Sequence, residues 1–98
     1  MQSTRNLRPP VDIHETDKSW HIIADIPGVA EDAVELTVEK NTLYMQAPIN
    51  DSSSWKRSFT IGHSVDTSAI TAKMNDGVLQ LELPKHPSSQ PRKIAIAS

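Results

Sequence analysis

The sequence predicts an all-β protein, an antiparallel β-sandwich of about seven strands. Apolar residues recur at every second position in short segments from Val11 to Leu83, and each segment is closed by turn-forming residues. Apolar residues at helical spacing are hard to find. Several short strands of this kind are typical of a sandwich, because each sheet needs a second sheet to cover its apolar face.

The alternating segments are separated by clear turn signals. Pro27-Gly28 closes the second segment, Lys40-Asn41 separates the third from the fourth, and Asp76-Gly77 is a strong hairpin signal between the last two. We expect one strand in each of residues 11–17, 19–28, 34–41, 42–48, 55–62, 70–74 and 78–84.

The connecting residues carry predictions of their own. A helical turn is expected only in residues 29–33 and 67–70. The polar residues 48–54 predict a solvated loop between two strands. After Pro84, a run of prolines, serines and cationic residues predicts an extended tether without structure of its own.

The end of the chain, PRKIAIAS, places two isoleucines one residue apart. In an extended segment this spacing puts Ile94 and Ile96 on the same side, so the tail is suited to laying two apolar side chains onto a surface. The surface would belong to a second subunit or to the same one. The alternatives are a last strand that pairs inside the same domain and a disordered end.

Length and composition limit the range of functions. With 98 residues the chain has room for one small domain with one core. Its charged fraction of 22% and net charge of −2 are those of a soluble globular protein and offer no basic surface for nucleic acid. The absence of cysteine excludes disulfides and thiolate catalysis. Without a signal-peptide core or an apolar run of about 20 residues, we expect a cytoplasmic protein with no membrane partner.

The stretch AKMNDGVLQLELPK carries a specific signature. Ala72, Gly77, Val78 and Leu79 resemble the A-x-x-x-(n)-G-V-L signature of the alpha-crystallin domain, the domain of the small heat-shock protein family. Upstream, PPVDIHETDKSWHIIADIPGV is similar to the family's opening strands, and WKRSFTIGHSVDTSAITA resembles its aromatic-x-Arg-x-Phe stretch. The resemblance extends over residues 10–96 and implies an immunoglobulin-like sandwich.

The resemblance also implies an organisation and a function. A short amino-terminal arm occupies residues 1–9, the alpha-crystallin sandwich residues 10–85, and a flexible carboxy-terminal extension residues 86–98. A member of this family is an ATP-independent holdase that binds partly unfolded client proteins, prevents their aggregation and forms a homo-oligomer or dimer. No cofactor, metal, nucleic acid or membrane partner is expected.

In this resemblance the tail has a defined role. Ile94-Ala95-Ile96 is similar to the family's Ile-x-Ile motif, which docks in an apolar groove of a neighbouring subunit. The groove would lie between the segments VELTVEK and VLQLELP, whose alternate residues share one face. Its candidate lining is Val34, Leu36, Leu79, Leu81 and Leu83.

Three departures from the family pattern bear on assembly. Bacterial and plant members carry a long loop, with a strand exchanged between dimer partners, where this chain has only residues 48–54. Where the family has a long aromatic arm, this sequence has residues 1–9, which is expected either from truncation or from a naturally short member, and Gly62 stands in place of the usual proline. The dimer mode is therefore not inherited from the family. The missing strand also suits an alternative function, a crystallin-like co-chaperone or adaptor module that binds one specific folded partner.

Two further residues are candidates for structural or interface roles. Arg57 alternates with Trp55 and Phe59, which point into an apolar layer, so its guanidinium should be paired or lie at an interface. Gly77 belongs to the hairpin turn and to the family signature.

An enzyme or a metal site is not expected. The residues His14, His21, His63 and His86 have no short ligand spacing. Serine, histidine and aspartate are present, but no nucleophile elbow, phosphate loop or paired-carboxylate cleft accompanies them.

Overall fold

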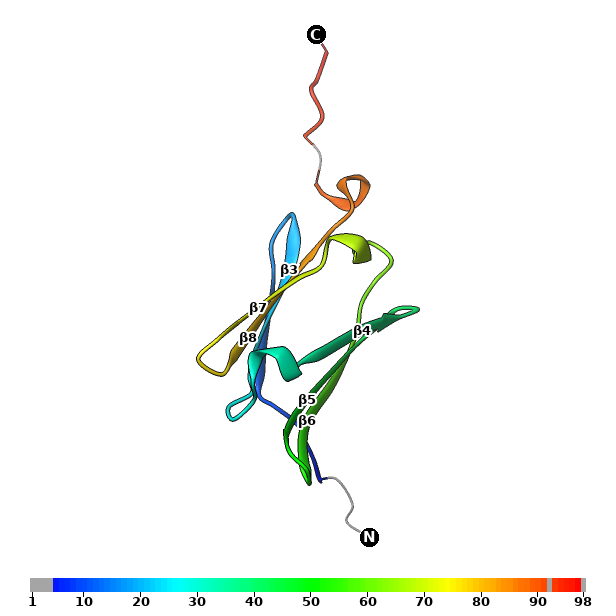
Figure 1. The fold of residues 1–98 in the computed structure, drawn as a ribbon. Coiled ribbons are helices and arrows are strands. Elements are labelled where there is room, and N and C mark those ends of the chain that lie inside the picture. The colour runs from blue at the N-terminus through cyan, green and yellow to red at the C-terminus, as the bar shows by residue number, and fades with distance from the viewer. Residues whose placement is uncertain (1–4, 92, 98) are drawn as a thin grey trace.

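Two four-stranded sheets face each other in the computed structural model, which describes residues 5–91 and 93–97 (Figure 1). Neighbouring strands are antiparallel except β1 and β6, which are parallel. One sheet has the order β1 (Arg5–Leu7), β6 (Ser53–Thr60), β5 (Thr42–Asn50) and β4 (Glu35–Glu39). The other has the order β2 (Val11–Glu15), β3 (Ser19–Asp25), β8 (Val78–Pro84) and β7 (Thr71–Asn75). The predicted all-β antiparallel sandwich is confirmed.

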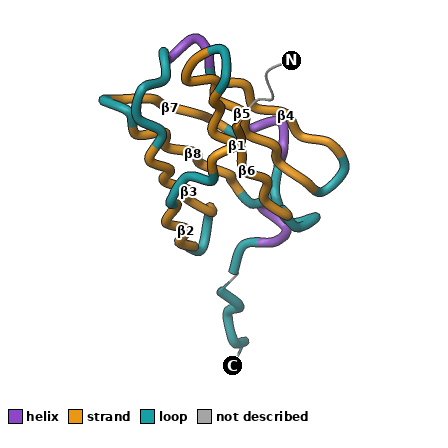
Figure 2. The backbone as a smooth tube through the Cα atoms, turned by 90° about the horizontal axis from the view of Figure 1, so that it is seen from below, coloured by secondary structure: helices purple, strands orange, loops and turns teal. Residues whose placement is uncertain are grey.

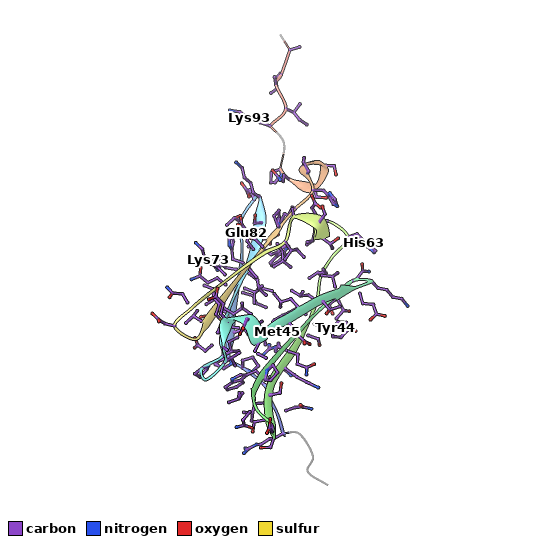
Figure 3. All side chains as sticks on the ribbon, in the orientation of Figure 1. Tyr44, Met45, His63, Lys73, Glu82 and Lys93 are labelled. Atoms are coloured by element: carbon purple, nitrogen blue, oxygen red, sulfur yellow. The ribbon has the colours of Figure 1, made fainter. Side chains whose placement is uncertain are left out.

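The core lies between the sheets and is filled by alternate residues of the strands. On β5, Leu43, Met45 and Ala47 are buried, whereas Tyr44 is exposed; Met45 and Tyr44 lie on opposite sides of the strand in Figure 3. The facing sheet contributes Ile22 and Ala24 from β3 and three leucines from β8. This is the two-residue period that the sequence shows, expressed as one buried face on each sheet.

The Asp76-Gly77 hairpin forms as predicted between β7 and β8. Both residues have positive φ, 50° for Asp76 and 78° for Gly77, as a tight two-residue hairpin turn requires. The turn also packs closely on the end of β3, because the Gly77 carbonyl accepts a hydrogen bond from the Ile26 N–H at 2.8 Å. A Cβ on Gly77 would lie 3.3 Å from the Cα of Pro27. Gly77 therefore has a structural role.

Substituting Gly77→Ala should lower the free energy of unfolding by about 1 to 3 kcal/mol, since alanine is strained at positive φ and its methyl group would press on the Pro27 backbone. Urea denaturation followed by circular dichroism measures this change. Gly62→Ala is the matched control. Its added Cβ would meet only the Ser64 side chain and backbone, at 3.7 Å or more, and its φ is not in the strained region, so its effect should be within about 1 kcal/mol of zero. Equal losses in the two variants would contradict this account of Gly77.

The connector between β5 and β6 is shorter than predicted. In place of a solvated loop over residues 48–54, β5 continues to Asn50 and β6 begins at Ser53. The Asn50 side chain accepts hydrogen bonds from the Ser52 N–H at 2.9 Å and the Ser52 hydroxyl at 3.2 Å, which closes the turn. Pro48 is tolerated because β4 pairs with β5 only as far as Gln46, so the missing N–H leaves no gap on that side.

Other local elements refine the predicted order. The helical turns expected in residues 29–33 and 67–70 are confirmed as 3-10 turns, η1 (Glu31–Ala33) and η2 (Thr67–Ala69). At η2 the hydrogen bond from the Ser68 hydroxyl to Asp66, at 2.6 Å, lowers the pKa of that carboxyl. A third 3-10 turn, η3 (Pro87–Ser89), and the short strand β1 were not predicted. β1 places part of the expected arm in the sandwich, beside the first residues of β6.

Candidate binding groove and tail

A small apolar groove of about 200 Å³ opens between the last strands of the two sheets, β4 and β7. Within the described part of the chain, neither strand has a neighbour on its outer side, so both offer unpaired backbone groups along the rim. The lining residues Val34 and Leu36 place the groove at the start of β4, the end of that strand that lies near β7 and β8 in Figure 1. The residues that line it are Glu31, Val34, Leu36, Ala72, Lys73, Met74 and Leu79.

The strand registers explain how these side chains meet. Leu36 lies opposite Met45 on β5, and Met74 lies opposite Leu79 on β8, so both edge strands point an apolar side chain toward the space between the sheets. Val34 directly follows η1, and that turn places it at the end of the groove. Glu31 and Lys73 supply one charge of each sign at the opening.

The structure divides the predicted lining residues into two groups. Val34, Leu36 and Leu79 line the groove together. Leu81 and Leu83 do not: they are 2% and 1% exposed and belong to the core. They share a face with Leu79, as the alternation predicts, and Leu79 is equally buried at 2% exposed; of the three, Leu79, near the start of β8, also borders the groove.

Two apolar lining residues, Ala72 and Met74 of β7, were not among the predicted set. The sequence contains a signal for them. In ITAKM, Ala72 and Met74 alternate in phase with Ile70, and the Asp76-Gly77 turn folds β7 directly onto β8. The hairpin partner of a groove strand therefore forms a second wall of the groove.

The tail leaves the sandwich at the end of β8 and projects away from it (Figure 1). Its first residues are fixed: the His86 N–H donates to the Ser64 carbonyl at 2.7 Å, and the Gln90 side-chain amide donates to the Lys85 carbonyl at 3.1 Å. The predicted tether is therefore partly ordered. Beyond it, Ile94 and Ile96 are 80% and 95% exposed and lie outside any strand.

Arg57 lies on the inward face of β6, opposite Met45. One guanidinium nitrogen donates to the Pro9 carbonyl at 3.1 Å, and the group lies over the Phe59 ring at 5.6 Å. Its Nε atom is buried and has no hydrogen-bond partner among the residues that the structure describes. The partner expected for this cation is thus a backbone carbonyl, at the point where the chain crosses from one sheet to the other between β1 and β2. An interface role for Arg57 remains a prediction.

Comparison with known proteins identifies the family. A family model described as the Hsp20/alpha crystallin family matches residues 12–97. This chain belongs to that family. Membership supports a chaperone role for this alpha-crystallin protein.

Two relatives define the extent of the likeness. Small heat shock protein C4 of Rickettsia felis is 28% identical over 93% of this chain and 65% of its own length. The probable 15 kDa heat shock protein of Leptospira interrogans is 32% identical over 86% of this chain and 75% of its own length. The chain thus spans about two thirds to three quarters of these relatives.

Solved structures agree with the fold. Heat shock protein 16.0 from Schizosaccharomyces pombe superposes with a TM-score of 0.77 at 24% identity, covering 94% of this chain and 77% of that one. A small heat-shock protein from Xylella fastidiosa, whose crystal structure reveals a distinct high order structure, superposes with a TM-score of 0.74 at 27% identity. The match covers 92% of this chain and 96% of that one.

Neither a metal cluster nor a membrane span is found in the part of this alpha-crystallin protein that the structure describes. Across residues 5–91 and 93–97, no three His, Asp or Glu side chains lie close enough to hold a metal ion. No helix within the same ranges is long and apolar enough to cross a bilayer. The rings of His14 and His21 stack on the outer face of the β2–β3 pair, with centroids 4.9 Å apart.

Proposed function

We propose that this protein is an ATP-independent holdase chaperone, which binds partly unfolded client proteins and prevents their aggregation. We further propose that it assembles by docking Ile94 and Ile96 of one subunit into the groove of another. The observation that carries the proposal is that one chain presents both an open apolar groove and an exposed pair of isoleucines.

The groove and the tail match in chemistry. Val34, Leu36 and Leu79 offer apolar contacts, and the free edges of β4 and β7 can bond to an extended peptide that enters between them. A tail in that conformation turns Ile94 and Ile96 toward the same wall. Since the tail points away from its own sandwich, this arrangement supports docking on another copy.

The energetics favour a reversible assembly. Burial of two isoleucines contributes roughly 3 to 6 kcal/mol. Ordering the tail and losing rigid-body freedom costs at least about 4 kcal/mol. A single docked tail should therefore bind weakly, with a net gain of at most about 2 kcal/mol and a dissociation constant of tens of millimolar or weaker before any strand hydrogen bonds are added. Several weak contacts per subunit would hold an oligomer together, because each later contact benefits from effective concentration, while still allowing subunits to exchange.

Reversibility supplies the chaperone mechanism. When a tail leaves, the groove and the neighbouring strand edges become available to other extended apolar segments, such as those of partly unfolded proteins. The groove accepts any chain that presents apolar side chains at alternate positions, so client binding needs no specific sequence. No nucleotide is consumed, because binding and release follow the tail equilibrium.

An aggregation assay tests the holdase proposal. Several unrelated heat-labile proteins are warmed with and without this protein, in the absence of ATP, and light scattering is recorded. We expect suppression of aggregation for most of them. No suppression at a several-fold molar excess would exclude the holdase. The adaptor alternative, which the short β5–β6 connector favours, would then be the function to pursue.

A further inference from the structure

The outer edge of β2 is a strand edge that contains neither proline nor lysine. β2 lies at the end of its sheet (Figure 2): it pairs with β3 on one side and has no neighbour on the other among residues 5–91 and 93–97. Natural edge strands are usually blunted by proline, a bulge or charged side chains. β2 has the sequence VDIHE and pairs with β3 without a register shift, and its Glu15, in phase with Ile13, is paired with Lys85. We propose that this edge pairs antiparallel with the β2 edge of a second copy, about a two-fold axis at Ile13.

The hydrogen bonds of the β2–β3 ladder fix which backbone groups are free. The Asp25 N–H donates to the Pro10 carbonyl, and the Thr16 N–H donates to the Ser19 carbonyl. Because these bonds alternate along an antiparallel pair, Asp12 and His14 also direct their peptide groups toward β3. Val11, Ile13 and Glu15 direct theirs outward, where a new strand would bind.

The free groups favour one register. With Ile13 opposite Ile13 of the second copy, Val11 lies opposite the copy's Glu15, and every outward N–H and C=O of β2 finds a partner. Two neighbouring registers also bring the outward backbone groups of the two copies opposite each other. In each of them, one end of β2 faces residues that lie outside the β2 of the second copy. Those registers form fewer hydrogen bonds.

The side chains favour the same register. On the outer face, pairing about Ile13 puts Asp12 opposite His14 of the second copy, a donor opposite a carboxylate. One neighbouring register would put Asp12 opposite Asp12 of the second copy, which is a repulsive contact. The other would put His14 opposite His14 of the second copy. The remaining charge on the strand is already neutralised, because the Glu15 carboxylate forms an ion pair with Lys85 Nζ.

The inner face adds an apolar contact. Ile13 is 50% exposed and stands beside a hollow of about 290 Å³, which is also lined by Trp20, Phe59 and Ile61. Across the two-fold axis the two Ile13 side chains would touch and cover this hollow from the side. The result is a continuous sheet through two sandwiches, formed without strand exchange and without the tail.

Cysteine cross-linking tests the register directly, because the chain contains no native cysteine. Opposed Ile13 residues would have Cα atoms about 5.5 Å apart, within the range of about 4.4 to 6.8 Å for a disulfide. Ile13→Cys should therefore form a covalent dimer under mild oxidation. Val11→Cys is the matched control on the same edge, since two Val11 residues would be separated by about 14 Å along the strands.

Both cysteine variants are made together with Ile94→Ser and Ile96→Ser, so that tail docking plays no part. We expect oxidation at Ile13→Cys to be at least about tenfold faster than at Val11→Cys. Equal rates, or no covalent dimer from Ile13→Cys, would overturn the proposal.

Charge reversal provides a second test in solution. Asp12→Lys alone and His14→Asp alone should each weaken dimerisation by about 3- to 30-fold, measured by sedimentation equilibrium. The double variant Asp12→Lys, His14→Asp should recover most of the loss. A double variant as weak as either single one would exclude this pairing.

These results are independent of the chaperone proposal. Cross-linking at Ile13→Cys in a protein that suppresses no aggregation would retain the β2 pairing and reject the holdase. Suppression of aggregation by a protein that does not cross-link at Ile13→Cys would retain the holdase and reject the β2 pairing.

Discussion

Replacing Ile94 and Ile96 together by serine should reduce the mass of the protein in solution from an oligomer to a dimer. Two isoleucines contribute roughly 3 to 6 kcal/mol when buried, so their loss should weaken each tail contact by a factor on the order of 10² to 10⁴. Both side chains are almost fully exposed in the single chain, so the sandwich should keep its fold. Light scattering after size exclusion measures the mass.

The dimer is the expected end point because the β2 edge is untouched by this change. Ala95→Ser with Ala97→Ser is the matched control, since these residues alternate with the isoleucines and face the other way in an extended tail. The control should keep the parent's mass. If the isoleucine variant and the parent have the same mass, the tail is not the assembly contact.

Sequence patterns specified this fold because its determinants are local. The alternation of apolar residues indicates which face of each strand is buried. Asp76-Gly77 indicates a hairpin, because both residues can adopt the positive φ values that its turn requires. The prediction of a loop over residues 48–54 was wrong because it rested on their polarity, which is typical of a loop. Polar residues on an exposed strand face have the same composition, and the Asn50 turn is recognisable only from its hydrogen bonds.

The candidate site was less predictable because a groove depends on the distance between sheets. Alternation shows that Leu79, Leu81 and Leu83 share a face, and the structure agrees. It does not show that Leu79 alone of the three borders the lining residues of β4 and β7. The same limit applies to β1, whose three residues have no pattern of their own and which forms only because β6 offers a free edge beside it.

Leu81→Ala and Leu36→Ala should separate the core from the groove. Leu81 is 2% exposed between the sheets, so its truncation should cost about 2 to 5 kcal/mol of unfolding free energy. For a domain whose total stability is about 5 to 15 kcal/mol this is a large share. Urea denaturation at fixed protein concentration, on the background of Ile94→Ser and Ile96→Ser, measures the loss without a contribution from tail docking.

Leu36→Ala should have the opposite profile. Leu36 is half-buried at the groove wall, so truncation should cost only about 1 kcal/mol of stability but remove one of the surfaces that Ile94 and Ile96 would contact. With the native tail, its oligomer should dissociate at higher protein concentrations than the parent's. Equal losses of stability in the two variants would contradict this division into a core leucine and a groove leucine. So would a Leu81→Ala variant that loses assembly but keeps its stability. On β8, Leu79 and Leu81 are equally buried, at 2% exposed, so position and not exposure distinguishes them: Leu79 lies beside Leu36 at the groove, and Leu81 does not.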